Sequence, residues 1–216
     1  MIRFWNWFTK ITAFPVQWLC FRTKIYYEDP AIQKRKIHGA AIIISNHTSV
    51  FDYAVWLFVF FSRTLRFQMA EVLFRKKVLG TFLRMLGGIY VNRNVYDFGF
   101  IAESEEILRK GGVVGIFPEA RLPLKGEERP LPFKTSAAYL ALSSGVPVIP
   151  VYTDGSYFGL KRARVIVGKP VDVSVFCGEN CSDKENMRAV SNGLRNKVIE
   201  LEKLLYEKTE KQNIRS

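Results

Sequence analysis

Short apolar runs rich in Ile and Val recur along the chain, and helix-forming segments separate them. Continuous runs of this kind are typical of strands that are buried on both faces of a sheet. The clearest runs lie at 40–45, 113–117 and 146–152. Helical patterns occupy 97–110, 133–144 and the segment from about 182 onward. This alternation predicts an α/β fold with a mixed, largely parallel sheet flanked by helices.

Weaker patterns complete this prediction. Further strands are expected at 64–70 and 89–91, and one or two more at 164–167 and 171–173. The C-terminal helix carries an apolar stripe that is typical of a packing face. Its members are Met187, Val190, Leu194, Val198, Leu201 and Leu205.

The charge of the chain points to an anionic partner. Its 216 residues include 32 Lys and Arg against 20 Asp and Glu, which gives a formal net charge of +12. Such an excess of positive charge favours binding to nucleic acid, to an anionic membrane surface or to a phosphorylated substrate. The length suits one domain, or one domain with an appendage.

The first twenty residues predict an amphipathic helix, broken near Pro15. Arg3, Asn6, Lys10 and Gln17 fall on its polar side. Aromatic side chains opposite basic ones suit a membrane interface, although the helix could also pack on the core of its own domain. No apolar run reaches the ~18 residues of a membrane span, so we expect peripheral attachment. The predicted docking residues are Phe4, Trp7, Phe8, Ile11, Phe14 and Trp18.

Cysteine and histidine are scarce. The three cysteines form no disulfide framework, and with only two histidines a structural zinc site is not expected. The sequence therefore predicts reduced thiols and no metal.

The pair His47 and Asp52 is the strongest candidate for chemistry. Asp52 is the only charge in an otherwise apolar run, and a buried carboxylate requires a partner. The two side chains can meet if His47 lies in a turn after a strand and Asp52 in the first turn of the next helix. Thr48 or Ser49 would then be the N-cap. In that arrangement the carboxylate orients one imidazole nitrogen and leaves the other as a base. Without any catalysis, Ser49 and Asp52 also fit a capping box.

Four sequence blocks resemble those of the PlsC-type glycerolipid acyltransferases, in the same order. Asn46-His47-x4-Asp52 matches the first block, and Tyr90–Arg93 resembles the second. Phe117–Arg121 resembles the third, and Val146–Val151 resembles the fourth. Together they span positions 46 to 151, which makes the resemblance specific.

The resemblance implies acyl transfer from a thioester, on coenzyme A or acyl carrier protein, to the free hydroxyl of a 1-acylglycerol 3-phosphate. No cofactor is implied beyond that co-substrate. His47 would be the general base and Asp52 would orient it. On this basis we expect a membrane-docking segment at 1–30 and an acyltransferase domain at 31–216. The expected location is the cytoplasmic face of a membrane.

The resemblance also implies a set of residues that bind the acceptor. The third block departs from the family pattern, because Ala120 stands at the usual Gly, Arg121 at the Thr and Leu122 at the Arg. Arg121 could serve the phosphate from a shifted position, and Glu119 could hold the loop or the arginine instead of touching substrate. Ala120 indicates either that the turn needs no positive φ or that it tolerates strain. The expected substrate-binding residues are Asn46, Arg93, Glu119, Arg121 and Lys134.

Three other functions are compatible with parts of the sequence. A nucleic-acid binder would explain the charge but neither Asp52 nor the aromatic N-terminus, so no nucleic acid is expected. A non-catalytic, basic membrane-binding protein would need the amphipathic helix but not His47. An acyltransferase acting on another lysophospholipid, or a phospholipid-remodelling enzyme, would use the same His47 and Asp52. Basic clusters at 34–36 and 75–77 would assist docking on an anionic leaflet.

Overall fold

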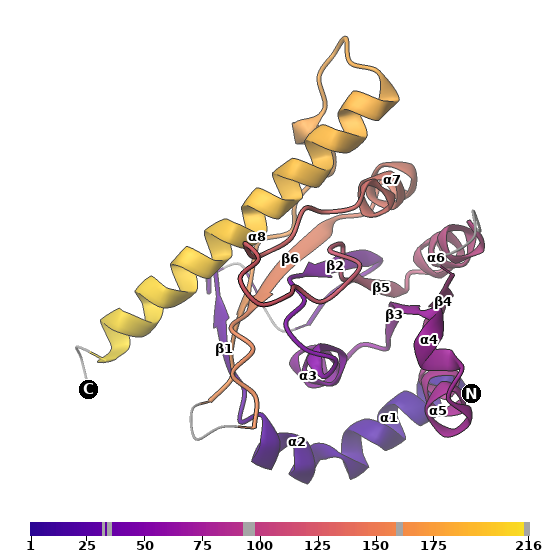
Figure 1. Cartoon of the computed structure of the whole chain (residues 1–216), viewed down its shortest axis with the longest axis vertical. Coiled ribbons are helices and arrows are strands. Elements are labelled where there is room, and N and C mark those ends of the chain that lie inside the picture. The colour runs from indigo at the N-terminus through magenta and orange to yellow at the C-terminus, as the bar shows by residue number, and fades with distance from the viewer. Residues whose placement is uncertain (32, 34–35, 93–97, 159–161, 214–216) are drawn as a thin grey trace.

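The computed structural model of the chain describes residues 1–31, 33, 36–92, 98–158 and 162–213 (Figure 1). The strands found there are β1 (Lys24–Tyr27), β2 (Ala41–Ser45), β3 (Leu65–Ala70), β4 (Ile89–Val91), β5 (Val113–Ile116), β6 (Val148–Thr153) and β7 (Arg164–Val167). The helices found there are α1 (Ile2–Thr12), α2 (Phe14–Cys20), α3 (Asp52–Val59), α4 (Glu71–Phe74), α5 (Lys77–Leu86), α6 (Gly99–Arg109), α7 (Thr135–Ser144), the 3-10 helix η1 (Val173–Phe176) and α8 (Asp183–Asn213).

These strands form one sheet in the order β1-β7-β6-β2-β5-β3-β4. All neighbouring pairs run parallel except β6 and β7, which pair antiparallel. The predicted α/β fold with a mixed, largely parallel sheet is therefore confirmed. β2 lies in the middle of the sheet, and its five residues are all buried.

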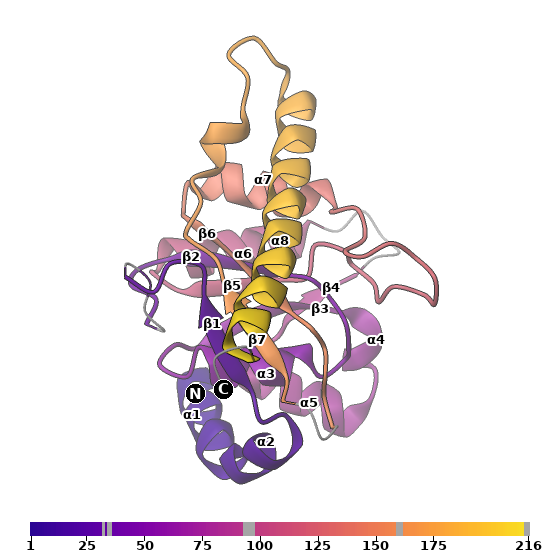
Figure 2. The same ribbon diagram turned by 90° about the vertical axis from the view of Figure 1, so that its left-hand side faces the viewer.

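The two faces of the sheet are covered by different helices. On one face, Ile42 and Ile44 of β2 share a core with side chains of α6, α7 and α8. On the other face, Ile43 packs in a core with Trp56 of α3. Figure 2 shows α8 lying along the outside of the first face. Because both faces are covered, the central strands consist of uninterrupted apolar residues.

One expected strand is replaced by a turn. Val171 makes only an isolated bridge to Val148, and Val173 already begins η1. The cause is local, because the Asp172 carboxylate accepts a hydrogen bond from Ser174 N at 3.0 Å and caps the 3-10 helix. Only the first of the two possible strands, β7, therefore forms at 164–173.

The N-terminal segment folds as two short helices along the outer side of α3 (Figure 1). The break falls at Ala13, and Pro15 lies in the first turn of α2, where its missing N–H costs nothing. The helical part of residues 1–30 ends at Cys20, and β1 then pairs with β7 in the sheet.

The polar side of α1 and α2 faces the domain, except that Arg3 is exposed. Asn6 and Lys10 are each 1% exposed, and Gln17 is also buried. The Lys10 ammonium donates hydrogen bonds to the carbonyls of Phe61 and Arg63, at 3.0 and 2.6 Å. Burial lowers the pKa of Lys10 to about 8. Asn6 and Lys10 thus fasten α1 to backbone carbonyls of the domain, whereas Gln17 of α2 donates to the Thr23 hydroxyl.

The apolar side of the same helices faces outward. Trp7 is the least exposed of its residues, because its ring packs edge-on against Phe61. A helix that packs on the core of its domain buries its apolar stripe, but here that stripe is uncovered. The exposed side chains are Phe4, Trp7, Phe8, Ile11, Phe14, Val16, Trp18 and Leu19.

Candidate active site

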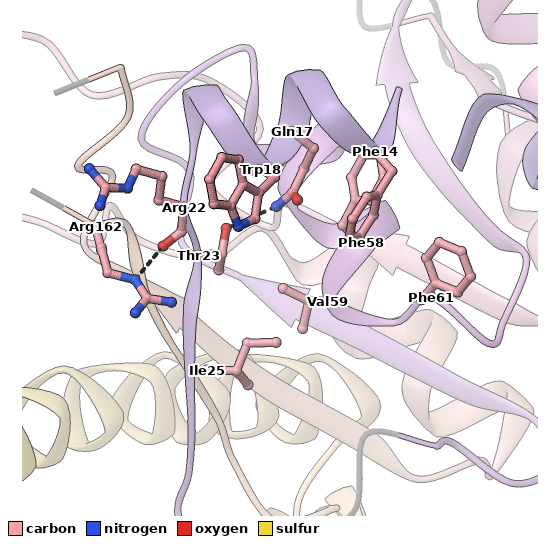
Figure 3. A pocket seen from close by; sticks show the side chains of 10 residues that line it. All are labelled: Phe14, Gln17, Trp18, Arg22, Thr23, Ile25, Phe58, Val59, Phe61 and Arg162. Atoms are coloured by element: carbon pink, nitrogen blue, oxygen red, sulfur yellow. Dashed lines mark hydrogen bonds between the residues drawn. The ribbon is translucent and has the colours of Figure 1, made fainter. Parts of the chain in front are cut away.

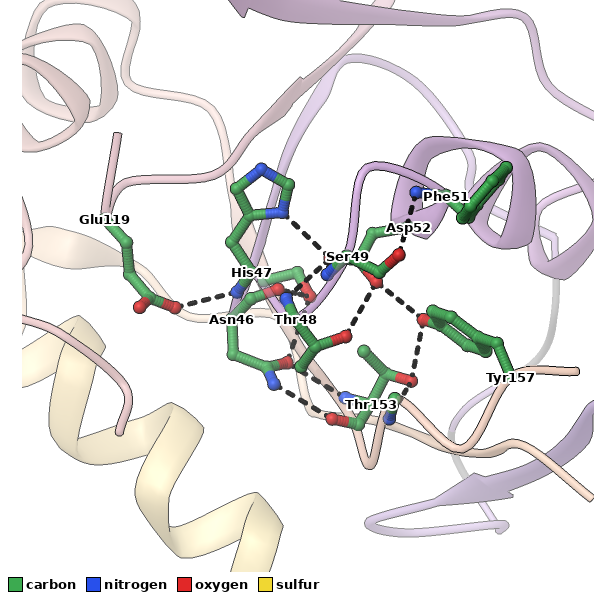
Figure 4. Close-up of polar contacts among 11 residues, drawn as sticks. Asn46, His47, Thr48, Ser49, Phe51, Asp52, Glu119, Thr153 and Tyr157 are labelled. Carbon is green, nitrogen blue, oxygen red and sulfur yellow. Dashed lines mark hydrogen bonds and ion pairs between the residues drawn. The ribbon is translucent and has the colours of Figure 1, made fainter. Parts of the chain in front are cut away.

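His47 and Asp52 meet at the carboxyl end of the central strand. His47 lies in the loop after β2, and Asp52 is the first residue of α3. In open α/β sheets, ligands bind outside the carboxyl ends of the strands. The imidazole Nδ1 lies 2.8 Å from Oδ2 of Asp52, and the second ring nitrogen points away from the carboxylate (Figure 4).

The carboxylate of Asp52 is fully buried and receives several further hydrogen bonds. Oδ2 accepts the backbone N–H groups of Thr48 and Ser49 at 2.7 and 2.9 Å. Oδ1 accepts the Thr48 hydroxyl at 2.9 Å and the Tyr157 hydroxyl at 2.7 Å (Figure 4). A buried carboxylate with this many donors is held in one orientation.

The prediction that Thr48 or Ser49 is the N-cap of the helix carrying Asp52 is wrong. Phe51 occupies the N-cap position of α3, and no side-chain hydrogen bond caps that helix. The Asp52 carboxylate accepts the loop N–H groups of Thr48 and Ser49, and the Ser49 hydroxyl accepts the N–H of Phe51 at 3.2 Å instead of one within the helix. The bond from Ser49 N is half of a capping box, but here it belongs to a larger network centred on Asp52.

Tyr157 is a site residue that the sequence did not reveal. It follows β6, 105 positions after Asp52, and no local pattern links the two. Burial, and after it the negative charge of Asp52, raise the pKa of Tyr157. Its hydroxyl therefore stays protonated and donates to the carboxylate.

An aromatic stack fixes the plane of the His47 ring. Phe117 lies against it with ring centroids 4.3 Å apart and an interplanar angle of 16°. Phe67 packs behind Phe117 at 5.2 Å. Gly115 of β5 makes room for Phe67, because a Cβ at this position would collide with the ring. The histidine is thus held by Asp52 at one edge and by an aromatic wall on one face.

Glu119 holds the loops around His47. It is 2% exposed, and its two oxygens accept the backbone N–H groups of His47 and Leu131 at 2.7 and 2.8 Å. Burial raises the pKa of Glu119, and the two N–H donors oppose that effect. Of the roles that the sequence left open, this geometry matches loop support.

Asn46 has a similar bridging position. Its side-chain amide exchanges two hydrogen bonds of 2.9 Å with the backbone of Thr153 at the end of β6. The side chain is buried, so both of its amide atoms serve to join β2 to β6. This places His47 and the Tyr157 segment on adjoining strand ends.

A cavity of about 870 Å³ opens beside Phe117. Arg121 and Lys134 line it, and so do the first residues of α7. The Arg121 guanidinium forms a two-pronged ion pair with Glu127, with both distances 2.7 Å. This pairing, with further hydrogen bonding, lowers the pKa of Glu127 to about 2. Arg121 and Lys134 therefore bring two basic side chains to this cavity, whose wall also includes Glu119.

The turn between Glu119 and Arg121 is strained. Ala120 has a φ of +60°, in the left-handed region that favours glycine. The sequence allowed either a turn without a positive φ or a turn that tolerates strain. The turn tolerates strain, since it keeps its positive φ with an alanine.

Some predicted residues lie outside the described part of the chain. They are Arg93 of the second block and residues 34–35 of the first basic cluster. Asn92, which precedes Arg93, lines the cavity beside Phe117.

The described residues contain no group of three or more His, Cys, Asp or Glu side chains that could hold a metal ion. The three cysteines are free thiols. No helix in the described ranges is both long enough and apolar enough to cross a membrane.

The geometry suits proton abstraction. With Nδ1 directed to Asp52, the other ring nitrogen of His47 is left for a substrate, and the side chain is 20% exposed. The buried carboxylate stabilises the imidazolium that forms when this nitrogen takes a proton. His47 itself lines a smaller cavity of about 210 Å³, which shares Glu119 with the cavity beside Phe117. There such an arrangement can take a proton from a hydroxyl or a water.

Comparisons with known proteins agree on one group. A family model described as Acyltransferase matches residues 24–154. The 1-acyl-sn-glycerol-3-phosphate acyltransferase of Bacillus subtilis is 25% identical over 146 residues, which cover 65% of this chain and 70% of that protein. The human 1-acyl-sn-glycerol-3-phosphate acyltransferase beta is 30% identical over 62% of this chain, which spans about half (49%) of the human protein.

A solved structure extends the similarity to nearly the whole chain. The crystal structure of the 1-acyl-sn-glycerophosphate (LPA) acyltransferase PlsC from Thermotoga maritima matches with a TM-score of 0.61 and 26% identity. The match covers 93% of this chain and 79% of that one.

Proposed function

The chain belongs to the Acyltransferase family, in its PlsC-type branch, and on that premise we propose which acyl transfer it catalyses. The proposed reaction moves a fatty acyl group from a thioester to the free hydroxyl of 1-acylglycerol 3-phosphate. The names of the relatives and the two basic side chains in the cavity beside Phe117 support this acceptor.

The proposal rests on the hydrogen bond between His47 and Asp52 at the carboxyl end of β2. The free nitrogen of His47 takes the proton of the acceptor hydroxyl as its oxygen attacks the thioester carbonyl. A C–O ester bond forms, the C–S bond breaks, and the proton passes from His47 to the leaving thiolate. Asp52 does not exchange the proton, because its charge serves to hold and stabilise the imidazolium.

The acceptor phosphate is proposed to lie in the cavity beside Phe117. Lys134 directly precedes α7, and the first turn of that helix lines the same cavity. A lysine and a helix N-terminus together favour a phosphate. Arg121 adds a guanidinium that Glu127 keeps in a fixed orientation. Arg93 is proposed as a further contact from the resemblance alone.

The donor is proposed to be acyl-CoA or an acyl carrier protein, and the thiol of either is the leaving group. The reaction as written needs no metal and no cofactor beyond this co-substrate. Every proton in it is carried by His47.

The exposed side chains of α1 and α2 are proposed to rest in the membrane interface. Aromatic and aliphatic side chains point outward, while Asn6, Lys10 and Gln17 are buried against the domain. An amphipathic helix with its apolar face uncovered partitions into the headgroup region of a bilayer. We propose peripheral attachment in this way, on the cytoplasmic face, which would bring the acceptor lipid to the site.

Thiol release tests the proposed reaction. Purified protein is mixed with detergent-dispersed lysophosphatidic acid and either acyl-CoA or acyl carrier protein as donor, and the ester product is identified by mass spectrometry. We expect thiol release that depends on the acceptor, together with formation of phosphatidic acid. Activity confined to another lysophospholipid would replace the proposed acceptor. Acyl exchange or hydrolysis without a thioester would indicate a remodelling enzyme instead.

A further inference from the structure

A second cavity, of about 510 Å³, lies beneath α2 (Figure 3). Its walls come from α2, from the turn that leads into β1, from the C-terminal end of α3 and from Arg162. The residues that line it are Phe14, Gln17, Trp18, Arg22, Thr23, Ile25, Phe58, Val59, Phe61 and Arg162.

The cavity has two chemically different ends. Figure 3 shows Arg22 and Arg162 at one end and Phe14, Phe58 and Phe61 at the other, with Trp18 between them. Gln17 and Thr23 hydrogen-bond to each other at 3.2 Å, so this amide donor is already used. A ligand that fills the cavity therefore needs an anionic group at one end and an apolar chain at the other.

Hydrogen bonds hold the two arginines of the cationic end next to each other. Arg162 donates from Nε to the carbonyl of Arg22 at 2.9 Å, which ties the two residues together. Arg22 has a φ of +46°, and the neighbouring Ala163 N–H bonds Phe21 O at 3.1 Å. Neither guanidinium forms an ion pair with a carboxylate of the described residues. The two positive charges are thus available to an external anion.

The cavity adjoins the exposed apolar face of α2, so a membrane lipid is the amphiphile that can reach it. Phe14 and Trp18 line it and also belong to the exposed apolar face of α2. It shares no lining residue with the cavity beside Phe117 or with the smaller one at His47. A lipid held there would lie beside the membrane face and away from the reacting groups.

We propose that this cavity binds one net-negative phospholipid of the bilayer as a ligand that is not consumed. Its phosphate lies between Arg22 and Arg162, and an acyl chain runs past Trp18 toward Phe58. Guanidinium groups match phosphate oxygens in geometry and charge. The inference rests on the proposed docking of α1 and α2, and it adds a lipid preference that docking alone does not give.

Soluble short-chain lipids test the site without requiring membrane docking. Calorimetric titration compares dihexanoyl phosphatidylglycerol, dihexanoyl phosphatidylcholine and inorganic phosphate. The variants are R22Q/R162Q and, as a control with the same charge change, K184Q/R188Q at the start of α8. That end of α8 lies at the opposite end of the molecule from α2 (Figure 1). K134Q reports binding in the active-site cavity.

We expect saturable binding of phosphatidylglycerol that weakens about tenfold or more in R22Q/R162Q and stays unchanged in K184Q/R188Q and K134Q. Equal affinity for phosphatidylcholine, or for phosphate alone, would overturn the assignment to an anionic lipid. Binding lost in K134Q and kept in R22Q/R162Q would also overturn it, because the ligand would then occupy the active-site cavity. Wild-type acyl transfer in the same preparation is read separately, so failure here leaves the proposed reaction standing.

Discussion

The hydroxyl of Tyr157 lies 2.7 Å from Oδ1 of Asp52 and donates a hydrogen bond to it. The other oxygen of the same carboxylate receives Nδ1 of His47 at 2.8 Å. Asp52 thus stands between a tyrosine from the segment after β6 and a histidine from the loop after β2. The ring of Tyr157 packs edge-on against Phe21 at 5.3 Å, just after α2. Through Tyr157, the carboxylate that orients His47 is therefore linked to a residue next to α2.

Replacing Tyr157 with Phe should slow catalysis without unfolding the protein. The ring and its contact with Phe21 remain, while a hydrogen bond to a charged group, of about 1.5–3 kcal/mol, is lost. We expect kcat to fall about tenfold with little change in KM, since Tyr157 positions Asp52 and does not line the acceptor cavity. Steady-state kinetics with Tyr139→Phe, an exposed position on α7, provides the comparison. An unchanged kcat would contradict the positioning role.

Replacing Glu119 with Gln should lower both stability and activity. Glu119 accepts one backbone N–H on each oxygen, but a glutamine has a single acceptor oxygen. One buried N–H is then unsatisfied, which costs about 1–3 kcal/mol. Denaturant unfolding should report this loss, and the displaced His47 loop should reduce acyl transfer. Glu207→Gln, at an exposed position on α8, is the control, and equal stability of the two variants would refute the role given to Glu119.

Lys10 should make folding more favourable as the pH rises. Its pKa is about 8 in the folded protein against 10.5 as the ordinary value. Between these values the unfolded chain binds more protons, so the free energy of unfolding increases with pH. The gain from this group should be of the order of 1–3 kcal/mol. We would measure it as the difference in unfolding free energy between wild type and Lys10→Met at pH values below and above this window. A difference that does not change with pH would show that the ammonium is not buried.

Polar substitutions on the exposed face of α1 should weaken membrane binding but not folding. Phe8 and Ile11 are 48% and 64% exposed, so their replacement by Ser removes little packing. Each large apolar side chain inserted into the interface contributes up to about 1.5–3 kcal/mol. We expect the double variant to partition into liposomes about a hundredfold less strongly. Val175→Ser, at an exposed position on η1, should bind like wild type, and equal partitioning of all three proteins would place the dock elsewhere.

The central strands could be predicted from the sequence, because burial on both faces leaves an unbroken apolar run. β2 and β5 lie where the Ile- and Val-rich runs placed them. His47 and Asp52 could also be paired from the sequence, since an isolated carboxylate in an apolar run needs a nearby partner.

Two features depend on contacts between distant segments and could not be predicted. Tyr157 reaches Asp52 only because β6 lies beside β2 in the sheet. The amphipathic pattern of α1 was plain, but the sequence allowed either face to pack inward. Lys10 decides the orientation, because the carbonyls of Phe61 and Arg63 are placed to receive its ammonium.

The proposed role of His47 as general base is tested by acceptor-dependent thiol release in His47→Ala. The backbone N–H that bonds Glu119 remains in this variant, so circular dichroism and thermal unfolding should match wild type closely. Loss of a general base should reduce transfer by about two to four orders of magnitude. His38→Ala, which removes the other, exposed histidine, should retain full activity. Transfer by His47→Ala at the wild-type rate would contradict the role of His47 as general base.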